Sequence, residues 1–214
     1  MRPIGKAVLA FSLVTLMTSP AWAQGGRGFG MMGGLFTNKS VQKELKTDDA
    51  QSEKLNAFVK EFQDKHRPDF EKVRELPQDE RREKMQELNR TLNPELMAGV
   101  KDILKPEQVT RFQQIQLQQG GPGALSRPHV QEKLKLTDDQ KSKAREINEE
   151  LQSSSREAFQ SSQGDREGAM KKVADLRKQA NEKVQALLTD DQKKTWKEMT
   201  GEPFEVKFER PAAN

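Results

Sequence analysis

The sequence predicts an all-α protein made of long amphipathic helices, arranged as two duplicated helical-hairpin units. Three observations support this prediction. Helix-start motifs recur along the chain, apolar residues recur at helical spacing, and one block of sequence is repeated 89 residues later. One third of the residues are charged and one third are hydrophobic. This composition favours helices that pair in a thin layer over a thick globular core.

Residues 1–23 predict a signal peptide. Arg2 and Lys6 form a basic start, residues 7–17 form an apolar run, and Ala21-Trp22-Ala23 provides small residues for cleavage. We therefore expect a periplasmic or secreted protein. Because no later segment is apolar enough to span a bilayer, no stable membrane insertion is expected; a retained anchor is the alternative.

Charge and cysteine content exclude several classes of protein. Without Arg2 and Lys6, 35 basic residues oppose 33 acidic ones, so no excess of positive charge indicates nucleic-acid binding. The absence of cysteine excludes disulfides and thiol chemistry.

Residues 24–37 are rich in glycine, and we expect a flexible leader, because so few side chains can offset the entropy of ordering. Contact of Phe29, Met31 and Met32 with a partner is the alternative.

The first helical repeat is expected at residues 38–119. Its opening block, Val41 to Lys46, returns as Val130 to Lys135, and 130 minus 41 gives the displacement of 89. At this displacement Asp48 aligns with Thr137 and Gln51 with Gln140. Asp is as good a helix N-cap as Thr, so Asp48 and Gln51 are an imperfect copy of the same capping box.

Apolar residues follow this cap at helical spacing. Leu55, Phe58 and Phe62 lie on one helix face, and the helix is expected to end near Arg67 because Pro68 disfavours the α conformation before it. A second helix follows, with a kink or restart at Pro94.

A degraded copy of the motif begins the last helix of this repeat. Lys105 replaces the capping Thr, while Leu104 and Gln108 are retained, displaced by 84 residues from Leu188 and Gln192. Phe112 continues its apolar stripe. Residues 120–128, beginning Gly-Gly-Pro-Gly, are expected to be a linker.

The second repeat is expected at residues 129–201 and carries the two complete motifs. In each motif, the Thr hydroxyl accepts a hydrogen bond from the backbone N–H three residues later, and the Gln side chain accepts one from the backbone N–H of the Thr. A Leu precedes each cap. The motif residues are Leu136, Thr137 and Gln140, then Leu188, Thr189 and Gln192; their stripes carry Ile147, Leu151 and Trp196. Residues 202–214 alternate apolar and charged residues, and we expect an extended tail laid along its own protein.

These motifs, in an exported, cysteine-free and highly charged helical chain, resemble the LTxxQ-motif (Spy/CpxP-like) family of periplasmic proteins. The resemblance covers residues 41 to about 201. It implies long curved helices that form a cradle, commonly as a homodimer, and a role in envelope stress. The best understood members hold unfolded clients without ATP.

The chain departs from the family in carrying two motif pairs where members typically carry one. We expect the two halves to pack as a pseudo-dimer within one chain, so that the protein is a monomer with internal pseudo-symmetry; a homodimer is the alternative.

Catalysis finds little support. His66 and His129 follow no ligand spacing and are interpreted as surface residues beside proline turns. The Asp pairs at 138/139 and 190/191 are interpreted as first-turn charges that complement the helix dipole. We expect no enzyme, metal or cofactor. Some relatives bind zinc through His- or Cys-rich tails, and none exists here.

The apolar stripes have two interpretations, as core or as client-contact surface. The candidates are Leu55, Phe58, Phe62, Phe112, Ile147, Leu151 and Trp196. In a thin helical layer, uncovered apolar residues among charged ones would hold unfolded chains weakly. The leading hypothesis is therefore an ATP-independent holdase for unfolded or partly folded envelope proteins. The alternatives are a stress-signalling adaptor that binds a sensor protein and a non-catalytic envelope scaffold.

Overall fold

The computed structural model describes residues 30–162 and 164–207, and within them it is all-α, with nine α-helices and one 3₁₀ helix. The signal peptide predicted at residues 1–23, the start of the leader and the end of the tail lie outside the described residues. None of the helices in the described part combines the length and the apolar character that a bilayer crossing needs.

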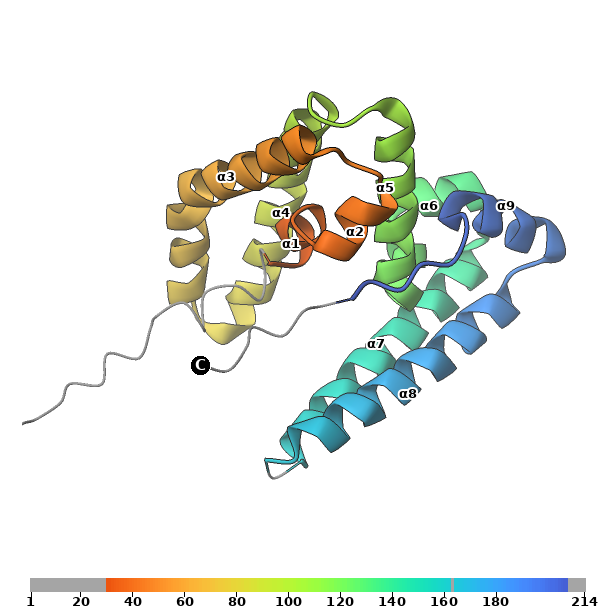
Figure 1. Cartoon of the computed structure of the whole chain (residues 1–214). Coiled ribbons are helices and arrows are strands. Elements are labelled where there is room, and N and C mark those ends of the chain that lie inside the picture. The colour runs from red at the N-terminus through yellow and green to blue at the C-terminus, as the bar shows by residue number, and fades with distance from the viewer. Residues whose placement is uncertain (1–29, 163, 208–214) are drawn as a thin grey trace, which may run out of the picture.

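The first half of the chain contains five helices. They are α1 (Gly30–Phe36), α2 (Lys39–Glu44), α3 (Asp49–Glu75), α4 (Gln78–Lys101) and α5 (Pro106–Gly120). The long helices α3 and α4 form an antiparallel pair, and α1 and α2 lie between this pair and α5 (Figure 1).

The second half begins with η2, a 3₁₀ helix (Gly121–Ser126). The α-helices α6 (Pro128–Leu134), α7 (Asp138–Gln160), α8 (Arg166–Leu187) and α9 (Asp190–Thr200) follow. α7 and α8 form a long antiparallel hairpin that projects away from the first half, whereas α9 packs beside α5 and α6 (Figure 1).

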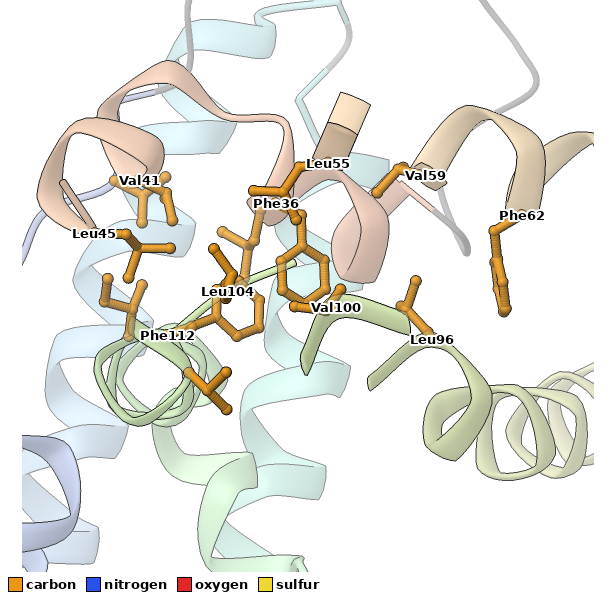
Figure 2. Packing of buried hydrophobic residues seen from close by; sticks show 14 of the residues in the cluster. Phe36, Val41, Leu45, Leu55, Val59, Phe62, Leu96, Val100, Leu104 and Phe112 are labelled. Carbon is orange, nitrogen blue, oxygen red and sulfur yellow. The ribbon is translucent and has the colours of Figure 1, made fainter. Parts of the chain in front are cut away.

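The larger core belongs to the first half and is centred on α1. Phe36 is 1% exposed and stacks on Phe112 of α5, with ring centroids 3.8 Å apart and planes 14° from parallel. Leu55 of α3 and Val100 of α4 surround this pair (Figure 2). The flexible leader expected at residues 24–37 is therefore wrong for Gly30–Phe36, because burial of the apolar residues at its end compensates for ordering the glycines.

A smaller core joins η2 and α6 to the base of the α7–α8 hairpin. It contains Leu117, Ala124, Leu125, Val130, Leu134, Leu136, Ala144, Val184 and Leu188. The linker expected at residues 120–128 is instead a packed element, because Pro122, Ala124 and Leu125 of η2 are buried against α5, α6, α7 and α8.

Both long helices of the first half continue through a proline. α3 was expected to end near Arg67 but extends to Glu75, and Figure 1 shows it bending in its second half. Phe70 and Val73, which follow Pro68, are 7% and 8% exposed. Their burial compensates for the hydrogen bond that Pro68 cannot donate. α4 likewise contains Pro94.

Residues 202–207, the described part of the expected tail after α9, lie along the first half. Phe204 N donates to Gln118 Oε1 at 2.8 Å, and Lys207 N donates to Ser40 Oγ at 3.0 Å. Val206 is buried in the larger core, and Phe204 packs on its edge. Residues 202–207 therefore connect the end of the second half to α2 and α5.

Candidate binding surface

The four predicted helix starts lie where the motifs indicate. In α7, Gln140 N donates to Thr137 Oγ1 at 3.2 Å, and Thr137 N donates to Gln140 Oε1 at 3.0 Å. Thr189 and Gln192 form the same box at the start of α9, at 3.3 and 2.9 Å. Both complete motifs are thus capping boxes.

The two imperfect copies differ in what they retain. Asp48 keeps the box at the start of α3, accepting from Gln51 N at 2.7 Å and donating its own N–H to Gln51 Oε1 at 3.3 Å. At α5 the Lys105 N–H still donates to Gln108 Oε1 at 2.8 Å. Because a Lys side chain has no acceptor, only this half of the box exists.

The motif glutamines also pair across each half, a contact that the capping motifs alone do not predict. Gln140 Nε2 donates to Gln192 Oε1 at 2.7 Å, and Gln192 Nε2 donates to Gln140 Oε1 at 3.0 Å. Gln51 and Gln108 exchange the same two bonds, at 2.9 and 3.1 Å. We call each of these a reciprocal glutamine pair. The only sequence signal for it was that both boxes of a half end in Gln rather than Glu.

Each reciprocal glutamine pair also binds the backbone of the preceding helices. Gln140 Nε2 donates to Leu187 O at the end of α8, and Gln192 Nε2 donates to Leu134 O at the end of α6. In the first half the matching acceptors are Ile103 O and Leu45 O. A pair therefore joins two helix starts to two helix ends, whose carbonyls otherwise lack partners.

A left-handed residue follows the short helix at the same place in both halves. Lys46 has φ 53° and Lys135 has φ 51°, and they are separated by the 89 residues of the sequence displacement. The N–H of the next residue reaches back five residues, from Thr47 to Gln42 O and from Leu136 to Gln131 O. These helix ends present their last carbonyls to the reciprocal glutamine pairs.

Most of the candidate stripe residues belong to the cores. Leu55, Phe62 and Phe112 are at most 3% exposed. Phe58 packs on the larger core, whereas Ile147 and Trp196 pack on the smaller one, and Leu151 is half-buried. The leucines of the motifs, Leu104, Leu136 and Leu188, are also buried. These side chains stabilise the fold and leave the exposed apolar surface elsewhere.

The exposed apolar surface lies on the α7–α8 hairpin. Phe159, in the last turn of α7, is 47% exposed, and Met170, near the start of α8, is 53% exposed. They line an open groove of about 830 Å³ that continues along α8, which we call the α8 groove. Its other lining residues are Val173, Ala174, Arg177, Lys178, Asn181, Glu182 and Gln185.

Helical spacing places the groove residues of α8 on one face of the helix. The groove residues on α8 recur at intervals of three and four from Met170, so they form one stripe. Ala169, Ala180 and Val184 form a different buried face. α8 therefore has a buried face in the hairpin and a separate groove face, which is apolar at Met170, Val173 and Ala174 and polar beyond them.

The two histidines occupy different environments. His66 lies inside α3 and is 8% exposed, so its interpretation as a surface turn residue is wrong. Its Nδ1 is 3.4 Å from Asp69 Oδ2, its Nε2 is 3.3 Å from Glu95 Oε2 on α4, and its ring packs on Phe62. Because the two ring nitrogens face different carboxylates on opposite sides, this cluster does not form one metal site. His129 is exposed on α6.

Among the described residues, no group of three or more His, Cys, Asp or Glu side chains is placed to hold a metal ion. No protein-family model, curated protein or solved structure matches the chain.

Proposed function

We propose that this protein is an exported, ATP-independent holdase that captures unfolded or partly folded envelope proteins weakly. The observation that carries the proposal is the apolar patch in the α8 groove, where Phe159 and Met170 are half exposed beside Val173 and Ala174. Apolar side chains on a folded protein's surface favour contact with apolar segments of another chain. The predicted signal peptide at residues 1–23 supports the envelope as the compartment.

Charged side chains next to the apolar patch of the α8 groove favour weak and reversible capture of a client. Arg177 and Lys178 border the α8 groove, with Glu182 one turn further on. Exposed charges attract acidic segments at long range but contribute little to affinity, and salt screens them. Capture of acidic clients should therefore weaken as ionic strength rises.

The proposal includes the tandem arrangement of two Spy-like helical hairpins. It is supported by the second reciprocal glutamine pair and the second left-handed lysine, each at the position given by the sequence displacements of 89 and 84 residues. In this arrangement α2 to α5 correspond to α6 to α9, and the two halves form a pseudo-dimer within one chain. Light scattering of the mature protein tests it: a monomer is expected, and an obligate dimer that unfolds on dilution would contradict it.

Aggregation of a thermally unfolded client, followed by light scattering without ATP, tests the holdase function. Near-stoichiometric wild-type protein should suppress aggregation, and the double variant Phe159→Ser, Met170→Ser should lose most of this suppression. The matched control, Gln179→Ser with Ala186→Ser, changes exposed α8 residues outside the groove and should behave as wild type.

Circular dichroism should show the same helix content in all three proteins. If the wild type gives no suppression at any ratio, the holdase proposal is wrong. If the groove variant suppresses as well as the control, the assignment to the α8 groove is wrong.

A further inference from the structure

A second, more polar groove lies where the two halves meet. It has a volume of about 460 Å³ and is formed by α4, α5, α9 and the start of α6. Its apolar wall contains Met97, Leu117 and Met199, and amide and hydroxyl groups of α5 complete much of its surface. We call it the junction groove. It is separate from the α8 groove and does not depend on the holdase proposal.

The junction groove contains a cation that has no counter-ion among the described residues. Arg127 is half-buried, and no described residue makes a hydrogen bond or an ion pair with its guanidinium. Burial lowers the pKa of Arg127. The guanidinium is only partly desolvated, and an anion that enters the groove would supply it with a charge-assisted hydrogen-bond partner.

The guanidinium has space because residue 120 is glycine. A Cβ built on Gly120 would lie 3.1 Å from Arg127 Nη2 and 3.1 Å from Ala124 Cβ. The side chain of Arg127 thus lies over the end of α5. A Cβ at position 120 would therefore require the guanidinium or η2 to move by a few tenths of an ångström.

The neighbouring side chains define the charge of a suitable ligand. His129 also lines the groove. Although its side chain is largely exposed, partial desolvation first, and then the charge of Arg127, lower its pKa, while Glu132 opposes this effect. Glu198 lines the groove as well, without an ion pair to Arg127. When His129 is neutral, the groove carries the positive charge of Arg127 and the negative charge of Glu198. This balance favours a singly charged anion over a doubly charged phosphate.

We propose that the junction groove binds a monocarboxylate attached to an apolar group, either a free organic acid or the C-terminus of a peptide. The carboxylate would accept from the Arg127 guanidinium, a geometry in which two parallel hydrogen bonds are possible. Gln113 offers a further donor, and the apolar group would contact Met97, Leu117 and Met199.

NMR titration of the full-length mature protein tests this proposal. The probes are 4-methylpentanoate and acetyl-glycyl-glycyl-leucine, each compared with its amide, and inorganic phosphate, all at constant ionic strength. An acid bound beside Arg127 should perturb the His129 ring signals saturably and raise the pKa of His129, because it adds a negative charge nearby. The neutral amides should do neither.

Substitutions at Arg127 and Gly120 test whether the acid binds beside the guanidinium. Arg127→Gln should weaken the response about tenfold or more, since it removes the guanidinium. Gly120→Ala should weaken it less, since its Cβ moves the guanidinium by only a few tenths of an ångström. Arg156→Gln, which removes an exposed arginine of α7, should leave it unchanged. Response to one acid alone would identify that acid's source as the natural one.

Three results would overturn the proposal. They are a wild-type protein that responds to neither acid, amides that act as strongly as the acids, and phosphate that binds as tightly as the carboxylates. Because these readouts use the wild-type protein, they hold even where Arg127→Gln or Gly120→Ala fails to fold.

Discussion

The side-chain amides of Gln140 and Gln192 hydrogen-bond to each other in both directions, at 2.7 and 3.0 Å. Each glutamine also closes the capping box of its own helix and donates to a helix-end carbonyl. One pair of side chains therefore fixes the starts of α7 and α9 relative to the ends of α6 and α8. Gln51 and Gln108 do the same in the first half.

Replacing Gln140 by Ala should lower the free energy of unfolding by about 1–3 kcal/mol, because Leu187 O loses its donor and Gln192 loses both hydrogen bonds to the Gln140 amide. Gln192→Ala should have a similar effect, and the double variant should cost less than the sum of the two. Urea unfolding of the single and double variants measures this coupling. Gln179→Ala, on an exposed position of α8, is the control and should change stability by about 0.5 kcal/mol or less. Strict additivity of the two glutamine substitutions would contradict the reciprocal pair.

The incomplete box at α5 should be open to improvement. Lys105→Asp supplies the missing acceptor for the N–H of Gln108, as Asp48 does for Gln51, and should stabilise the protein by about 0.5–1 kcal/mol. Thr137→Ala removes an existing acceptor and should cost about 1 kcal/mol, whereas Thr137→Asp should be nearly neutral. Thermal unfolding compares the three variants. A destabilised Lys105→Asp protein would show that residue 105 does not act as an N-cap.

Removing the aromatic ring of Phe36 should destabilise the first half strongly. Phe36→Ala leaves a cavity against Phe112 and should cost about 3–5 kcal/mol. The matched control is Phe159→Ala, the same substitution at a 47% exposed position, which should cost about 0.5 kcal/mol. Chemical denaturation measures both. Equal effects of the two substitutions would mean that α1 does not contribute to the core.

Two helical glycines should respond in opposite ways to alanine. A Cβ at Gly99 of α4 would lie 2.2 Å from the ring of Phe58, so Gly99→Ala should cost about 1–3 kcal/mol by forcing α3 and α4 apart. A Cβ at Gly34 of α1 meets nothing within 4 Å, and Gly34→Ala should be neutral or stabilise by up to about 1 kcal/mol. Melting temperatures of the two variants distinguish these outcomes. A stabilised Gly99→Ala protein would contradict the close packing of α3 on α4.

The lowered pKa of His129 predicts a pH dependence of stability. Burial and then Arg127 disfavour the protonated ring in the folded protein, so the unfolded chain binds this proton more tightly. This contribution to stability should rise with pH between the folded-state pKa and about 6.5, and stay constant above that value. Comparing wild type with His129→Gln between pH 4.5 and 8 isolates it, since His66 is present in both proteins. If the wild type instead became more stable relative to His129→Gln as the pH falls, the prediction would be wrong.

Local sequence patterns sufficed for the helix starts. The boxes at Thr137 and Thr189, and the substitute cap at Asp48, depend on atoms within four residues of each other, so their hydrogen bonds follow from the sequence alone. The all-α class followed for the same reason, because helical spacing of apolar residues is local. The prediction was wrong where tertiary packing outweighed a local preference. Pro68 disfavours helix in the residue before it, yet α3 continues because later residues are buried.

The candidate site depended on tertiary structure much more than the fold class did. The stripe residues chosen from the sequence lie wholly or partly in a core, except the half-buried Leu151. The exposed residues Phe159 and Met170 belong to a face that only the packing of α7 on α8 reveals. The same holds for α1. Its glycines do not favour a helix locally, and the stacking of Phe36 on Phe112 stabilises it in the folded protein.

By itself, the sequence determined where the helices begin, which residue types cap them and that the same block occurs twice. The tertiary structure alone decided which apolar stripe stays exposed, that the motif glutamines pair with each other, and that Arg127 lies in a groove between the halves. The physical reason is range: caps and periodicity are fixed by neighbours along the chain, whereas exposure, pairing and desolvation depend on residues brought together from more than 50 positions away.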